Sequence, residues 1–192
     1  MRRRDVITIL GTAAAWPLAA HAQQRAMPVV GVLNSGAAAP FARMISAFDQ
    51  GLSEQGYVVG RNVRTELRWA DGQYDRLPDL AAELARLPVD VLASPGGDVA
   101  TVASRAATKT IPIVFAIPED PVSLGLVASL SRPGANLTGV NFFFGELVPK
   151  RLELLRELVP AMTRVAVFVN PANPARAEFL VREAESAGRT MG

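Results

Sequence analysis

The chain has 192 residues, of which 49% are hydrophobic, enough for one globular domain with part of a second. It has no cysteine, which excludes disulfides and thiol nucleophiles, and its single histidine is His21. The chain after residue 22 therefore has neither a histidine-based catalytic triad nor a typical zinc site. The net charge of +2 comes entirely from the first five residues, MRRRD, so the rest of the chain is neutral and lacks the basic excess of nucleic-acid-binding proteins.

Residues 1–22 have the three parts of a secretory signal peptide. They begin with MRRR, continue with an apolar run at 6–20, and end at Ala20-His21-Ala22, a small-x-small cleavage site. The pair Arg3-Arg4 resembles a twin-arginine signal, and a Sec signal and a membrane anchor are the alternatives, although the apolar run is short for an anchor. We expect a mature protein that begins near Gln23, contains no histidine and lies in the periplasm.

The next part of the chain alternates between strand and helix patterns. Residues 29–33, VVGVL, form an unbroken apolar run typical of a strand that is buried on both faces. Apolar residues at helical spacing predict a helix over 41–52, and residues 63–69 alternate as in an edge strand with one wetter face. The same patterns predict helices at 77–87, 99–107 and 124–130, and strands at 89–93, 113–117 and within 136–144.

This alternation, with short connections, predicts an α/β fold with a doubly wound parallel sheet. The pattern then restarts with a helix at 148–159, a buried strand at 165–169 and a helix at 175–187 that ends at Gly188. These last elements are too few to bury the faces of a sheet. We therefore predict a first α/β lobe over 23–141 and an incomplete, truncated second lobe over 142–192.

Ligands of open α/β sheets bind beyond the carboxyl ends of the strands, so the loops there supply the candidate site. Gly96 and Gly97 expose backbone N–H groups at a helix N-terminus, which suits a ligand carboxylate. Asp120 can pair with an ammonium group, and Phe142 or Phe143 can cover an apolar part. The loops after the strands contribute Asn34, Ser35, Ser94, Gly96, Gly97, Asp98, Asp120, Asn141 and Phe142.

Each of these features also has a purely structural interpretation. Residues 94–98 can be a tight turn with Asp98 as a helix cap, and Asp120 can cap the helix that follows it. One of Phe142 and Phe143 is expected in the core, because neighbouring strand residues face opposite sides. Neither a dinucleotide fingerprint nor a phosphate-binding loop occurs, and we expect no cofactor and no metal site.

Several segments resemble one known family. The start MRRRDVITILG, then VVGVLNSG, ATKTIPIVFAIPEDPVSLGLVASLSRPGANLTGVNFF, ELVPKRLELLRELVP and RVAVFVNPANP are similar to ABC transporter substrate-binding proteins of the ABC_sub_bind family. These are relatives of tryptophan- and tyrosine-binding transport proteins. The resemblance covers essentially the whole chain, although the family more often has a small residue or glycine at Pro118-Glu119.

The resemblance implies a type 1 periplasmic-binding-protein fold, in which two lobes close over a ligand. It also implies that Asn170 lies at the second lobe's edge of the cleft, although Asn170 and Asn173 between prolines also suit a plain turn. The implied function is the extracytoplasmic solute-binding component of an ABC importer, with an inner-membrane permease as partner and a small solute, an amino acid being one candidate. An exported α/β enzyme and a non-functional truncated fragment are the alternatives.

Overall fold

A computed structural model describes residues 27–191, and in it five parallel strands form one sheet in the order β2-β1-β3-β4-β5. The strands are β1 (Val29–Asn34), β2 (Arg64–Trp69), β3 (Val91–Ser94), β4 (Ile113–Ile117) and β5 (Leu137–Asn141). The strand order changes direction at β1, as in a doubly wound fold, which confirms the predicted class. The predicted signal peptide, residues 1–22, lies outside the described residues.

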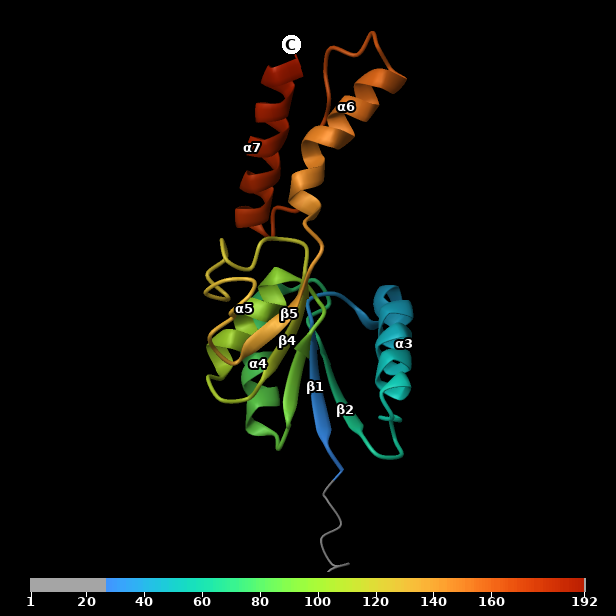
Figure 1. Cartoon of the computed structure of the whole chain (residues 1–192), viewed down its shortest axis with the longest axis vertical. Helices are drawn as coiled ribbons and strands as arrows, with labels where there is room; N and C mark the ends of the chain where they lie inside the picture. The colour runs from blue at the N-terminus through green and yellow to red at the C-terminus, as the bar shows by residue number, and fades with distance from the viewer. Residues whose placement is uncertain (1–26, 192) are drawn as a thin grey trace, which may run out of the picture.

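Helices cover both faces of the sheet, as Figure 1 shows. The helix α3 (Ala38–Glu54) lies on one face, and α4 (Leu77–Arg86) and α5 (Asp98–Ala107) lie on the other. All six residues of β1 are buried, as its unbroken apolar run predicts. The larger core cluster lies between the sheet and the α4–α5 layer and includes Leu33, Leu77, Leu84, Leu92, Ile113 and Ile117.

The opposite face of the sheet is covered less completely. The helix α3 packs through Ile45 and Phe48 against a small cluster around Val30 and has no buried residue of its own. On β4 and β5, beyond the reach of α3, Val114 and Val140 have 43% and 57% of their surface exposed. The central strands β1, β3 and β4 therefore have a dry face toward α4 and α5, and the opposite face is open at β4 and β5.

The connection from β4 to β5 differs from its prediction. Residues 124–130 form a series of turns and not a helix, in which Pro121 accepts hydrogen bonds from the N–H groups of Leu126 and Val127. Gly125 has a φ of 63°, a left-handed conformation that interrupts a right-handed helix. The apolar residues that suggested a helical face are nevertheless used, because Leu126 and Val127 are buried in the core.

The last part of the chain comprises η2 (Phe144–Leu147), α6 (Val148–Leu158) and α7 (Pro174–Met191). The helices α6 and α7 pack side by side and extend away from the carboxyl ends of the strands (Figure 1). The predicted end at Gly188 is wrong, because α7 continues to Met191. Among residues 27–191, no helix combines the length and apolarity needed to cross a membrane.

The predicted strand at 165–169 is also wrong, since this segment has no regular structure. Phe168 is 96% exposed, and Val165 and Val167 are nearly half exposed. A parallel strand needs a neighbouring strand to satisfy its backbone groups, and within the described residues none lies beside this segment. An apolar run alone therefore did not suffice to form a strand.

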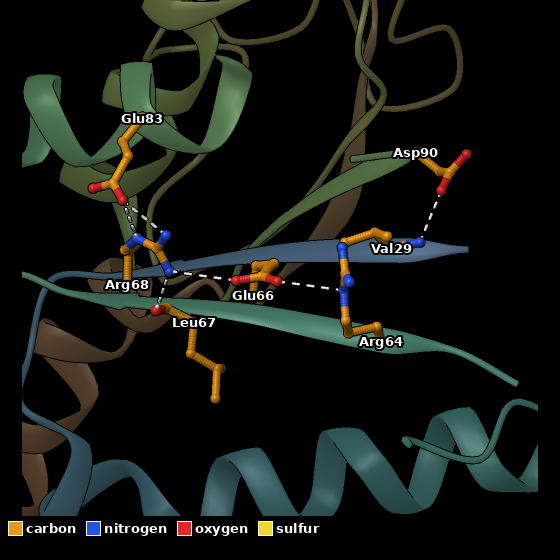
Figure 2. Close-up of polar contacts among 7 residues, drawn as sticks. All are labelled: Val29, Arg64, Glu66, Leu67, Arg68, Glu83 and Asp90. Carbon is orange, nitrogen blue, oxygen red and sulfur yellow. Dashed lines mark hydrogen bonds and ion pairs between the residues drawn. The ribbon is translucent and has the colours of Figure 1, made fainter. Parts of the chain in front are cut away.

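The wetter face of β2 carries a row of ion pairs, drawn in Figure 2. Arg68 donates to Glu83 of α4 at 2.8 Å, and Glu66 lies between Arg64 and Arg68 at 3.3 and 3.7 Å. These charges suit an edge strand, because they discourage pairing with another chain. The hydrogen bond from Arg68 lowers the pKa of the Glu83 carboxyl, and the same bond raises the pKa of Arg68.

Replacing Glu83 by glutamine is expected to lower Tm by about 1–2 °C at neutral pH, because the Arg68 pair is exposed and weak. The folded-state pKa of Glu83 lies below its ordinary value of 4.5, so its stabilisation is present above that value and is lost as pH falls through the folded pKa. The difference between variant and wild type should therefore shrink as pH falls below 4.5. Thermal unfolding at neutral pH and at a series of pH values below 4.5 checks this, with Glu178→Gln as the exposed control.

Candidate functional site

The loop after β1 is tied to the loop after β3. Asn34 is fully buried, and its Oδ1 accepts a hydrogen bond from the N–H of Gly36 at 2.8 Å. The Oγ of Ser35 donates to the carbonyl oxygen of Gly96 at 2.5 Å. A Cβ on Gly96 would lie 2.6 Å from both the Cα of Asn34 and the backbone nitrogen of Ser35, so only glycine fits there.

The turn at 94–98 leads directly into α5. Gly97 is the N-cap of α5, with a φ of 92° and a ψ of −173°, a conformation that is almost restricted to glycine. A substitution at Gly97 therefore strains the backbone, although open space surrounds its Cα. Ser94 is buried, and its Oγ lies 2.8 Å from the Oγ of Ser104 on α5, so this pair fastens the helix to the strand.

The two aspartates of the predicted site have different surroundings. Asp98 is the first residue of α5 and makes no cap hydrogen bond, so the capping interpretation of this residue is wrong. Asp120 accepts hydrogen bonds from the N–H groups of Val122 and Ser123 at 3.0 and 3.3 Å. Both oxygens of Asp120 thus stabilise the turn that follows β4, as the structural alternative predicts, although the expected helix is absent.

The end of β5 presents a polar side chain followed by aromatic ones. The Oδ1 of Asn141 accepts a hydrogen bond from the N–H of Phe143 at 2.6 Å. Phe142 and Phe143 are 50% and 38% exposed, so the expectation that one of them lies in the core is wrong. The strand ends at Asn141 and Phe143 has a φ of 50°, which breaks the alternation of faces. Phe142 stacks on Phe144, with ring centroids 5.6 Å apart.

The start of α7 and the loop before it meet this same edge of the sheet. Asn170 donates to the hydroxyl of Tyr74 at 3.2 Å, and its Oδ1 accepts from the N–H of Ala172, as in a turn. Asn173 is buried and donates from its Nδ2 to Asp98 at 3.1 Å. The loop before α7 is therefore attached to this edge at two points. Asn170 contacts Tyr74, and Asn173 contacts Asp98, so the two predicted residues Asn170 and Asp98 do not contact each other through these bonds.

One ion pair at this edge was not among the predicted residues. Arg176 of α7 pairs with Glu119, whose side chain is only 13% exposed. The sequence carried one signal for Glu119, since a charged residue directly follows the apolar strand β4 and its turn proline. Arg176 gave none, because a cation in the first turn of a helix is ordinary on a solvated face.

The unpaired buried atoms of the molecule gather at this edge. Among the described residues, three buried side-chain polar atoms have no hydrogen-bond partner: Nδ2 of Asn34, Oε2 of Glu119 and Nδ2 of Asn141. They follow or end β1, β4 and β5, and most buried polar atoms in proteins are paired. The orientation of both asparagine amides is fixed, because each Oδ1 accepts a backbone N–H. Two donors and one acceptor at the carboxyl edge are thus buried without a partner.

The described residues line a larger and a smaller cavity in different parts of the molecule. The larger, of about 590 Å³, lies between α6, α7 and residues 160–167, away from the strand ends, and is lined mainly by apolar side chains such as Leu152, Met162 and Val181. The smaller, of about 200 Å³, is lined by Asn141 and Phe143 together with the turns after β4. The larger cavity borders residues 165–167, which lack strand partners, and none of the three unpaired atoms lines it. We therefore place the candidate site at the sheet edge.

Residues 39–191 match the family described as ABC transporter substrate binding protein. The chain belongs to this family. Its members are binding proteins and not enzymes, so the alternative of an exported α/β enzyme is set aside. The resemblance seen in the sequence is thereby confirmed, together with a periplasmic-binding-protein-like α/β fold. No group of acidic residues and histidines that could hold a metal ion occurs within residues 27–191.

The proteins similar to this chain are longer than it is. A tyrosine-binding protein of Clostridioides difficile (strain R20291) is 30% identical over 123 residues, which are 64% of this chain and 35% of the relative. A conserved domain protein from Vibrio cholerae has a TM-score of 0.72 at 29% identity, and a Streptococcus pneumoniae ABC domain in complex with L-Trp has 0.69 at 24%. For both structures the match covers 85% of this chain and 55% of theirs, so the chain spans about half their length.

Proposed function

We propose that this protein is the extracytoplasmic solute-binding component of an ABC importer and that it binds an amino acid at the carboxyl edge of its sheet. The observation that carries the proposal is the set of three unpaired buried atoms at that edge. Every other buried side-chain nitrogen or oxygen among the described residues has a hydrogen-bond partner. A buried donor without a partner lowers the stability of the protein. A ligand that accepts a hydrogen bond from this donor removes that penalty.

The donors favour a carboxylate. The unpaired Nδ2 of Asn141, at the end of β5, is a donor on the strand beside β4. The Nδ2 of Asn34 and the N-terminus of α5 behind Gly97 form a second group of donors on the other side of β4, where Ser35, Gly96 and Ser94 fix the loops by hydrogen bonds and close packing. We assign the ligand carboxylate to the Asn141 donor, the carboxylate seat, which lies beside the half-exposed Phe142.

The aromatic residues favour a ligand with a flat apolar part. Phe142 and Phe144 are stacked and about half exposed beside Asn141, so a ring placed on them would bury apolar surface from both partners. The relatives named for tyrosine and solved with L-Trp agree with such a ligand. We therefore propose an aromatic amino acid as the solute, the segment 142–192 as part of a second lobe, export by the N-terminal signal, and a membrane permease as the partner.

A thermal-shift screen of the full-length protein tests this function. The panel contains the common L-amino acids, simple sugars and short carboxylic acids. L-Tyrosine, L-tryptophan or L-phenylalanine should raise Tm, because a ligand at about 100 times its Kd adds about 2.7 kcal/mol to the stability. Stabilisation by sugars only, or by no amino acid, would overturn the proposal. Titration calorimetry on the positive ligands gives the affinity and the stoichiometry.

A further inference from the structure

We propose that Glu119 binds the ammonium group of the amino-acid ligand and that Arg176 occupies the same carboxylate in the empty protein, so that ligand and Arg176 compete. The inference rests on the proposed amino-acid-binding function. It assigns a specificity-determining residue and an internal competitor, and neither was among the predicted site residues.

The first observation is the state of the Glu119 carboxylate. One oxygen, Oε1, is paired with Arg176, and the other, Oε2, is buried and has no hydrogen-bond partner. A partly buried carboxylate is stable only when charged or hydrogen-bonding partners compensate for its lost hydration. Glu119 is therefore half satisfied, and an ammonium group with three donors is a chemical complement to it.

The second observation is the position of Glu119 relative to the carboxylate seat. Glu119 follows the end of β4, and β4 lies between β3 and β5 in the sheet. Asn141 ends β5 and is opposite Ile117 of β4, two residues before Glu119. Neighbouring strands are separated by about 4.8 Å, so Glu119 and Asn141 come from adjacent positions at the strand ends. An α-amino acid carries its ammonium and carboxylate groups on the same carbon, so one zwitterion can bind to both side chains.

The third observation is that a ligand has no access to Glu119 in this arrangement. The free oxygen Oε2 is shielded from solvent, so a neighbouring group must move before a ligand can reach it. Arg176 is held to the same carboxylate and comes from α7, and Asn173 fastens the start of α7 by donating to Asp98. Binding of an ammonium group to Glu119 therefore requires displacement of Arg176 and a shift of the first turn of α7.

The competition predicts that two substitutions in the full-length protein change the ligand affinity in opposite directions. Calorimetry with L-tryptophan and L-tyrosine measures these affinities. Glu119→Gln removes the anionic partner and should weaken binding about tenfold or more. Arg176→Gln removes the competitor and should tighten binding by about tenfold. Arg182→Gln, which removes an exposed arginine of the same helix, is the matched control and should bind as the wild type does.

A ligand without the ammonium group separates this role from a general effect on folding. Indole-3-propionate has the ring and the carboxylate of tryptophan, and its affinity should change little in either variant. The wild type binding an amino acid as tightly as, or more tightly than, the Arg176→Gln protein would overturn the competition. This result would leave the proposed function intact. Binding by Arg176→Gln alone would support the competition strongly. Failure of both proteins to bind any amino acid would overturn the inference and the proposed function together.

Discussion

Gly96→Ala is expected to lower the free energy of unfolding by about 2–3 kcal/mol, because a Cβ at this position overlaps backbone and cannot be relieved by a side-chain rotation. It would lie 2.6 Å from the Cα of Asn34 and 2.6 Å from the nitrogen of Ser35. Asn34 is the last residue of the buried strand β1 and has no room to retreat. The substitution would also disturb the hydrogen bond from Ser35 to the carbonyl of Gly96.

Denaturant unfolding of three alanine variants checks this expectation. Gly51→Ala is the control, because Gly51 lies within α3 with nothing near its Cα, and alanine there should stabilise the helix by about 0.5–1 kcal/mol. Gly97→Ala should cost about 1–3 kcal/mol through its positive φ alone. A Gly96→Ala protein as stable as the wild type would contradict the close packing of the two loops.

Asn141→Asp is expected to weaken the binding of an aromatic amino acid about 100-fold, the largest effect on affinity proposed for the carboxylate seat. The substitution keeps the shape of the side chain and the oxygen that accepts the N–H of Phe143. It replaces the unpaired donor Nδ2 by an anionic oxygen, which repels the ligand carboxylate. Calorimetric titration with L-tyrosine measures the loss.

Two comparisons make the Asn141 result specific. Tyramine, which has the ring and the ammonium group of tyrosine without the carboxylate, should lose no affinity to the Asn141→Asp protein. Asn62→Asp makes the same change of charge at an exposed position between α3 and β2, and it should leave the affinity for L-tyrosine unchanged. Equal affinity of Asn141→Asp and wild type for L-tyrosine would remove Asn141 from the site.

Local sequence patterns predicted an element correctly where its burial leaves a clear apolar period in the sequence. The strand at 29–34 and the helices at 77–86 and 98–107 were predictable, because burial on both faces or on one stripe leaves a clear apolar period. The same signal failed at 165–169, where the apolar run has no strand to pair with, and at 124–130, where Gly125 takes a left-handed conformation.

The sequence by itself determined the α/β class, the family and the loops that carry the candidate site, because parallel strands place their carboxyl ends at one edge whatever their order. Only the tertiary structure decided which side chains in those loops are already paired. Ser94 and Asp120 are engaged within the protein, whereas Asn34, Glu119 and Asn141 each retain an unpaired atom. Hydrogen-bond partners such as these depend on distances between segments far apart in the chain, which no local pattern encodes.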